Sequence, residues 1–263
     1  MNTYEKLEAA TKKNNSILCC GLDSDVNKIP EFLGRNLNGI LEFNRLIIEA
    51  TKDLVNSYKI NFAFYEQYGT EGFEILKKTF EFIPDDIVTI ADAKRGDIGN
   101  TSKSYAKSCF EYFNADSITV NPYMGYDSYA PFLEYEGKMV FLLALTSNPG
   151  SADFQRLIAD GKPIYRHVFE KTMARTDDAQ LGYVVGATHP DELADLRSIA
   201  PKRVLLIPGV GAQGGDVEAV IKANDGGPCV INASRGIIYA SAGKDFAEKA
   251  REKAEFFRGQ FNR

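Results

Sequence analysis

One short segment of the chain carries charged side chains at a spacing that suits proton chemistry. Asp92, Lys94 and Asp97 directly follow the hydrophobic run 87–90, which predicts a buried strand. Because side chains alternate along a strand, Asp92 and Lys94 are expected on the same side, about 7 Å apart along the backbone. Gly96 ends the strand, and Asp97 follows just beyond it. Two carboxylates beside one ammonium favour its charged form, so this lysine can donate a proton to a carbanion, although a structural ion pair would use the same residues.

Composition and charge set the broad class of protein. A chain of 263 residues with 44% hydrophobic content can bury a large core. Its net charge of −5 argues against nucleic acid or an anionic membrane as a partner, so a phosphate ligand would need a local cationic site. No apolar run approaches the roughly 20 residues of a membrane span. The first residues predict an amphipathic helix rather than a signal peptide.

The cysteines and histidines give no sign of a disulfide framework or a metal site. The cysteine spacing matches neither pattern, and only His167 and His189 supply imidazoles. We therefore expect no bound metal, and reduced, mostly buried thiols in a cytoplasmic protein. The cysteines are Cys19, Cys20, Cys109 and Cys229.

Short runs rich in β-forming residues recur along the whole chain. Their continuously apolar character is typical of strands covered on both faces, and helical patterns such as 40–48, 191–196 and 244–250 lie between them. The eight runs are 17–22, 58–63, 87–91, 117–120, 139–145, 182–186, 204–207 and 229–232. Eight β–α units predict a (β/α)8 TIM barrel, with a doubly wound open sheet as the alternative. Because no linker or low-complexity tract divides the chain, we expect one domain over residues 1–263.

Polar residues gather at the ends of these predicted strands. Barrel enzymes hold their chemistry at the carboxyl ends of the strands, so convergence there predicts a site. In strand order the polar features are Asp23, Lys59, the 92–97 cluster, the segment 145–150, the segment 208–216 and the segment 233–236.

The segment after the seventh strand suits a phosphate group. Glycines within 209–215 let the backbone approach a ligand closely, and Gln213 adds a side-chain donor. TIM barrels frequently bind phosphate with the loops after strands seven and eight. Arg235 supplies a fixed charge and a bidentate fork. A flexible turn, or an Arg235 paired at the surface with Asp216 or Glu218, is the alternative.

The string that runs from Asp92 to Thr101, D-A-K-R-G-D-I-G-N-T, resembles the active-site segment of orotidine 5′-monophosphate decarboxylases. The residues of this string are most similar to those of the bacterial type 2 branch of that family. The resemblance implies that Lys94 is the catalytic lysine, with Asp92 and Asp97 as its aspartates. It also implies that Ile98 and Thr101 bind the substrate.

The other strand ends match the remainder of that family's site. Asp23 and Lys59 correspond to residues that contact the ribose and complete an alternating charge network, and Ser147 to the serine that reads the pyrimidine edge. Family members often have glycine where this chain has Ser234, but a backbone N–H serves at that position. The residues that match the phosphate site are Pro208, Gln213, Ser234 and Arg235. Segments 121–125 and 187–190 also resemble the type 2 branch, but chemistry assigns no role to Asn121, His189 or Tyr239.

The resemblance implies a cytoplasmic homodimer that converts orotidine 5′-monophosphate to uridine 5′-monophosphate and CO2 without a cofactor. Loss of CO2 leaves a carbanion at C6 that no adjacent carbonyl delocalises, so the barrier must fall by on the order of 20 kcal/mol. No electron-sink cofactor motif is visible, and electrostatics would have to supply this. Lys94 would stabilise and then protonate C6. In the implied dimer, Asp97 serves the Lys94 of the neighbouring chain.

Three other functions compete with this interpretation. A Mg²⁺-dependent sugar-phosphate decarboxylase or lyase of the same superfamily shares the D-x-K-x-x-D string, but it needs carboxylates from neighbouring strands, where this chain offers Lys59 and Asn61. A Schiff-base aldolase needs a neutral Lys94, which flanking carboxylates disfavour. A non-catalytic nucleotide-binding barrel would be expected to lack the lysine or one aspartate.

Overall fold

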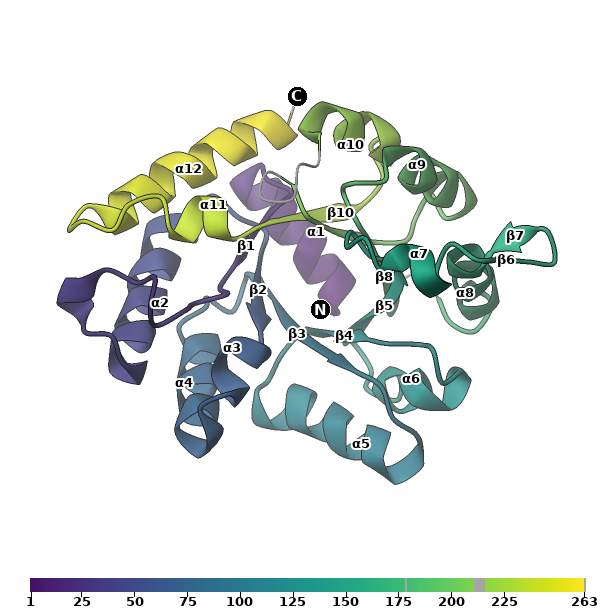
Figure 1. The fold of residues 1–263 in the computed structure, drawn as a ribbon, viewed down its shortest axis with the longest axis horizontal. Coiled ribbons are helices and arrows are strands. Elements are labelled where there is room, and N and C mark those ends of the chain that lie inside the picture. The colour runs from purple at the N-terminus through teal and green to yellow at the C-terminus, as the bar shows by residue number, and fades with distance from the viewer. Residues whose placement is uncertain (178, 211–215, 263) are drawn as a thin grey trace.

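Eight parallel strands close into a barrel in the computed structural model, which describes residues 1–177, 179–210 and 216–262 (Figure 1). The strands follow one another in chain order, and β10 pairs with β1 to complete the circle. This closure confirms the predicted TIM barrel and rules out the open sheet. The barrel strands are β1 (Leu18–Gly21), β2 (Ser57–Asn61), β3 (Val88–Arg95), β4 (Ser117–Val120), β5 (Met139–Leu145), β8 (Leu181–Val185), β9 (Leu205–Pro208) and β10 (Cys229–Ala233).

Helices surround the barrel, which is why its strands are apolar on both faces (Figure 1). The third helical pattern predicted from the sequence starts later than expected, at Phe246. The longer helices are α1 (Thr3–Asn14), α2 (Leu37–Thr51), α4 (Gly69–Glu81), α5 (Gly99–Lys107), α6 (Tyr126–Leu133), α8 (Ile164–Met173), α9 (Pro190–Ile199), α10 (Val217–Asn224) and α12 (Phe246–Phe261). Short helical turns are η1 (Glu31–Leu33), α3 (Ala63–Glu66), η2 (Ser108–Tyr112), α7 (Ser151–Phe154) and α11 (Arg235–Ile238).

A small antiparallel hairpin, which the sequence patterns did not predict, follows β5. Its strands β6 (Ile158–Ala159) and β7 (Lys162–Pro163) contain two residues each. Strands this short have no periodicity that a sequence pattern can reveal. The hairpin lies outside the barrel sheet.

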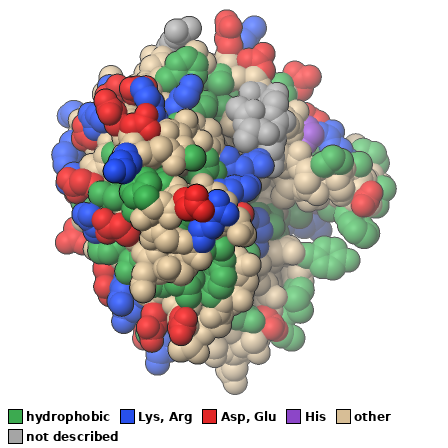
Figure 2. All heavy atoms as spheres, turned by 60° about the vertical axis from the view of Figure 1, so that its left-hand side comes forward, with side chains coloured by type: hydrophobic (Ala, Val, Ile, Leu, Met, Phe, Trp, Pro, Cys, Tyr) green, Lys and Arg blue, Asp and Glu red, His purple; other side chains and the backbone are tan. Residues whose placement is uncertain are grey.

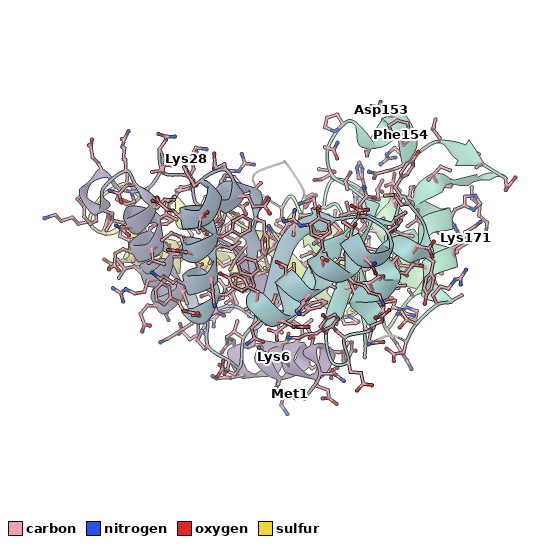
Figure 3. The ribbon with its side chains drawn as sticks, turned by 90° about the horizontal axis from the view of Figure 1, so that it is seen from below. Met1, Lys6, Lys28, Asp153, Phe154 and Lys171 are labelled. Carbon is pink, nitrogen blue, oxygen red and sulfur yellow. The ribbon has the colours of Figure 1, made fainter. Side chains whose placement is uncertain are left out.

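Helix α1 closes the amino-terminal end of the barrel. Figure 3 shows it with Met1 and Lys6 at one end of the molecule, whereas Asp153 and Phe154 of α7 lie at the opposite end. The helix begins with a capping box, in which the Asn2 side chain accepts a hydrogen bond from the Glu5 backbone and the Glu5 carboxylate accepts one from Asn2. Its buried Leu7 packs against the apolar side chains inside the barrel.

The inside of the barrel changes from apolar to charged along the strand direction. On β3, Val88 and Ile90 belong to the inner apolar cluster, and Asp92 is the next residue on the same face. On β4, Ser117 is followed two residues later by Thr119. An apolar base therefore supports a polar layer at the carboxyl ends of the strands.

The described residues confirm the expectation of free, buried thiols. All four cysteines are free and buried. On the face drawn in Figure 2, acidic and basic side chains are interspersed rather than gathered into one basic surface. Over the described part of the chain, no helix combines the length and the apolar character needed to cross a membrane.

Candidate active site

A charged cluster with Asp92 at its centre lies inside the barrel. Lys59 Nζ is 2.7 Å from Asp92 Oδ2, and Lys94 Nζ is 2.6 Å from Asp92 Oδ1. Asp23 Oδ1 lies 3.5 Å from Lys59 Nζ on the other side. The four side chains alternate in sign from Asp23 to Lys94, so every charge has an opposite charge next to it.

Strand register explains how residues far apart in sequence meet at this point. On neighbouring β1, β2 and β3, Lys59 pairs with Gly21 on one side and with Ile90 on the other. Lys59 and Asp92 therefore stand at neighbouring levels on the inner face of the barrel, and Asp23 follows the end of β1. The closed sheet thus brings the residues of the predicted alternating network together, and each charged group lies within ion-pair distance of the next.

Burial and charge act against each other on the pKa values of the central pair. Asp92 is only 7% exposed, and this burial raises the pKa of its carboxyl group. The ammonium groups of Lys59 and Lys94 more than offset burial, so the pKa of Asp92 lies well below its usual range. Burial likewise lowers the pKa of Lys59, but Asp23 and Asp92 outweigh it and hold that pKa above its usual range. Asp92 and Lys59 are therefore both charged at neutral pH.

A pocket at the carboxyl ends of the strands opens beside this cluster. Lys94 projects into it with half of its side chain exposed (51%). Apolar Val184 and Leu206 line part of its wall. Of the site residues expected from the sequence, those that line it are Asp23, Lys59, Asp92, Lys94, Pro208, Ser234 and Arg235.

Three further residues expected from the sequence lie after β3 and do not line the pocket. Within the described chain Asp97 makes no contact with its own Lys94, and its carboxylate accepts a hydrogen bond from the Ile98 backbone at 2.8 Å. Strand β3 ends at Arg95, and α5 begins at Gly99, so Asp97 lies in the short connection between the strand and the helix. Ile98 and Thr101 are exposed. Within one chain, only Asp92 of the two predicted aspartates flanks the ammonium.

Ser147 and Gln213 are the other expected residues outside the pocket lining. Ser147 is partly buried after β5, and its carbonyl oxygen accepts a hydrogen bond from the Thr188 hydroxyl at 3.4 Å. Gln213 lies outside the described residues.

The end of the pocket nearest to β9 and β10 carries the expected phosphate residues. Gly209 has a φ of 100°, a conformation that glycine adopts without strain. Arg235 is exposed and forms no ion pair within the described part of the chain. Asp216 instead caps α10 by accepting hydrogen bonds from the backbone of Glu218 and Ala219. The alternative pairing of Arg235 with Asp216 or Glu218 is therefore not observed.

The sequence patterns did not predict the polar lining residues Thr119 and Asn232. The Thr119 hydroxyl donates to Asp92 Oδ1 at 3.0 Å, and Asn232 lines the pocket with 8% of its surface exposed. Both occupy the inner face near the end of a strand. A single polar residue near the carboxyl end of an otherwise apolar strand is the signal that could have identified them.

The structure shows the contacts of the three residues to which chemistry alone assigned no role. The Tyr239 hydroxyl donates to the Asp23 carbonyl at 3.0 Å and accepts from the Asp25 backbone at 2.7 Å, so it fixes the loop that carries Asp23. The His189 ring contacts Arg156 at 2.6 Å, and burial followed by the Arg156 charge lowers the pKa of His189. Asn121 accepts from the Tyr123 backbone at 3.0 Å, a turn contact.

The fold and cluster together define a barrel enzyme with acid–base groups and a cationic residue at the carboxyl ends of its strands. Among the described side chains, no three or more His, Cys, Asp or Glu residues are grouped so that they could hold a metal ion.

Comparison with known proteins identifies the family. Residues 16–251 match the sequence profile of the orotidine 5′-phosphate decarboxylase / HUMPS family. Proteins named orotidine 5′-phosphate decarboxylase are 49% identical in Dehalococcoides mccartyi, covering 100% of this chain and 98% of that protein, and 51% identical in Flavobacterium johnsoniae, covering 96% and 94%. The solved structure of Leishmania donovani OMP decarboxylase superposes with a TM-score of 0.85 at 36% identity, covering 98% of this chain and 100% of that one. This chain belongs to the orotidine 5′-phosphate decarboxylase / HUMPS family.

The buried cluster makes stability depend on the charge of Asp92. Asp92→Asn leaves Lys59 buried with a weakened partner, and we expect it to lower the free energy of unfolding by about 3–5 kcal/mol at pH 7. Because the folded-state pKa of Asp92 is depressed, its stabilisation is present above the unfolded pKa of about 3.9 and is lost as the pH falls toward the folded value.

Urea unfolding of both proteins at a series of pH values measures this difference. It should stay constant from pH 7 to about pH 5 and shrink only below about pH 4. Asp86→Asn, which removes an exposed pair with Lys13, is the matched control and should cost less than about 1 kcal/mol. An Asp92→Asn protein as stable as the control would contradict the prediction.

Proposed function

We propose that this chain is an orotidine 5′-phosphate decarboxylase, converting orotidine 5′-monophosphate to uridine 5′-monophosphate and CO2 in pyrimidine biosynthesis. The observation that carries the proposal is the Lys94 ammonium, held by Asp92 and half exposed at the pocket. The shared name of relatives about half identical over nearly the whole chain supports the same substrate. The free cysteines support a cytoplasmic location, and we propose a single domain over residues 1–263.

In the proposed reaction Lys94 acts on the carbon that loses CO2. The C–C bond to the carboxylate breaks, its electron pair remains on C6, and the Lys94 ammonium stabilises this charge and then transfers a proton to it. Asp92 holds the ammonium in place through a 2.6 Å contact. With substrate bound, the apolar Val184 and Leu206 in the pocket wall would help to exclude water, and the ammonium charge would then be more effective.

We propose that this chemistry needs no metal or organic cofactor. A Mg²⁺-dependent sugar-phosphate decarboxylase or lyase would require free carboxylates to bind the ion. Here Lys59 Nζ lies 3.5 Å from Asp23 and 2.7 Å from Asp92, so an ammonium already occupies the space between the two carboxylates. This arrangement favours the cofactor-free reaction over the metal-dependent alternative.

The distal part of the substrate is proposed to bind between the ends of β9 and β10. Arg235, without an ion-pair partner in the described chain, would meet the phosphate, with backbone groups near Pro208 and Ser234 beside it. Gln213 is proposed to join them, and Ser147 to read the pyrimidine edge. Asp23 and Lys59 would contact the ribose.

We further propose a homodimer in which Asp97 serves the Lys94 of the other chain. Asp97 forms no ion pair with its own Lys94, and the motif resemblance implies that it serves the Lys94 of the neighbouring chain. Ile98 beside it is 51% exposed, and Tyr123 and Met124 after β4 are 84% and 52% exposed. Apolar side chains exposed to this degree favour burial against a second copy. Ile98 and Thr101 would then complete the partner's substrate site.

The first test is decarboxylation itself, measured by the loss of orotidine 5′-monophosphate absorbance with EDTA present. The parent chain should be active and unaffected by EDTA, whereas Lys94→Ala should lose at least about 99.9% of kcat because its ammonium acts in the transition state. Nucleotide binding should persist in the mutant, since the proposed phosphate contacts lie elsewhere. Lys52→Ala, at the C-cap of α2 where the ammonium pairs with Glu49 away from the pocket, is the control. Recovery of more than a few per cent of activity in Lys94→Ala would exclude the lysine as proton donor.

The second test distinguishes the loss of a phosphate contact at Arg235 from a general loss of activity caused by the substitution. Arg235→Ala should lower kcat/KM by about 100-fold, the effect of losing a charge-assisted contact worth about 3 kcal/mol. With orotidine, which lacks the phosphate, parent and mutant should react equally. Arg45→Ala, an exposed arginine paired with Glu42, is the control. An equal loss on both substrates would refute the phosphate assignment.

The third test concerns the shared site. Lys94→Ala and Asp97→Ala chains, each inactive alone, should regain activity when mixed, because one of the two sites in each heterodimer then has both residues intact. Random reassortment of a 1:1 mixture should give about one quarter of the parent activity per chain. Activity that stays at the level of the separate mutants would show that each chain uses its own Asp97, while leaving the decarboxylase proposal in place.

A further inference from the structure

The backbone of Lys94 has a conformation that its residue type disfavours. Its φ is 45°, in the left-handed region. The other non-glycine residues with positive φ in the described chain are Asn15, Asn114, Asp160 and Asp225, all of the types that tolerate this region. A lysine there is strained and must be held by its surroundings.

The hydrogen bonds around Lys94 show what holds it. The Lys94 backbone N–H donates to Thr119 Oγ1 at 3.0 Å, and Thr119 Oγ1 lies 3.0 Å from Asp92 Oδ1. Because the backbone N–H can only donate, the hydroxyl proton is free to go to the carboxylate, and the direction of both bonds is determined. The same Oδ1 accepts from Lys94 Nζ at 2.6 Å.

These three bonds form a closed ring that begins and ends at Lys94. The ring fixes the residue at its backbone nitrogen and at its ammonium, while the chain between them is half exposed. Thr119 itself is 1% exposed on the rigid inner face of β4, so its hydroxyl is a stationary point. A flexible lysine is thereby confined to one position at the pocket.

The neighbouring residue is anchored independently. The Arg95 guanidinium pairs with Glu66 and lies 5.0 Å from the ring centre of Tyr105, and the Arg95 carbonyl accepts from the Asn121 backbone at 2.7 Å. The sheet register shifts between Ala91 and Arg95, which places Lys94 in an irregular part of β3. The Arg95 side chain is held by Glu66 of α3 and Tyr105 of α5. On the pocket side, the hydrogen bond to Thr119 is the contact that fixes the position of the Lys94 backbone N–H.

We propose that Thr119 is a positioning residue, whose hydroxyl holds the Lys94 ammonium where it delivers its proton. The inference rests on the proposed function for the role of Lys94, but the ring itself can be tested without it. Thr119 does not need to touch the substrate to act in this way. Removing its hydroxyl should therefore affect the proton-transfer step rather than substrate capture.

Kinetics of three variants provide the main test. Thr119→Val, of similar shape without the hydroxyl, should lower kcat about 10- to 100-fold while KM changes less than about threefold. Thr119→Ser, which keeps the hydroxyl, should retain most of kcat. Ser117→Ala is the matched control, because Ser117 is buried on the same strand and bonds to the Thr89 carbonyl at 3.1 Å, toward the other end of the barrel. A Thr119→Val enzyme with kcat within about twofold of the parent would overturn the proposal.

Amide hydrogen exchange supplies a readout that does not depend on activity, and its first measurement uses the parent chain alone. In the parent chain the Lys94 amide should exchange at least about tenfold more slowly than in an unstructured peptide, because Thr119 accepts its hydrogen bond. In folded Thr119→Val this protection should be lost, and in Thr119→Ser it should remain. An unprotected Lys94 amide in the parent refutes the ring even if the enzyme is active, whereas a protected amide in a parent without decarboxylase activity contradicts the proposed function alone.

Discussion

The site depends on one buried carboxylate that two ammonium groups share. Asp92 lies deep in the barrel, with one oxygen on Lys59 and the other on Lys94. Each of these charges can be buried only because an opposite charge lies next to it. Removing one of them would leave its neighbour buried without a full partner. The apolar base that α1 closes from below keeps water away from one side of it. The charged layer is therefore the part of the barrel interior that is most costly to bury, and it lines the pocket.

The two lysines in this cluster have different surroundings and different consequences. Lys59 is buried, and its position between Asp23 and Asp92 makes it a fixed counter-charge. Lys94 contacts the same carboxylate but is half exposed to the pocket, where a ligand can reach it. The difference arises from the strands: β2 carries Lys59 in regular pairing, whereas β3 becomes irregular before Lys94. The regular end of β2 keeps the Lys59 ammonium buried, whereas the irregular end of β3 leaves the Lys94 side chain half exposed at the pocket.

Two cationic side chains, Arg235 and Lys94, lie at different places in the pocket and differ in whether they are paired. Arg235, at the end of β10, has no ion pair in the described chain, whereas Lys94 is tied to Asp92 on β3. A cation that is free can bind a strongly charged anion, and a cation already paired is better suited to stabilise charge that develops only during reaction. Under the proposed function, Arg235 at this barrel rim would bind the phosphate group and Lys94 would act as the preorganised proton donor.

Much of this arrangement could be predicted from the sequence, because it depends on local patterns. The eight apolar runs correspond to the eight barrel strands, and the spacing of Asp92 and Lys94 places both near one strand end. Other features depend on contacts between strands that no local pattern contains. Thr119 enters the cluster only because β4 lies beside β3 in a particular register, and Asp97 leaves it because the chain turns into α5. Residue types and periodicity determined which groups would meet inside the barrel, whereas register, backbone irregularity and chain direction, which are set by packing over the whole sheet, decided which of them touch.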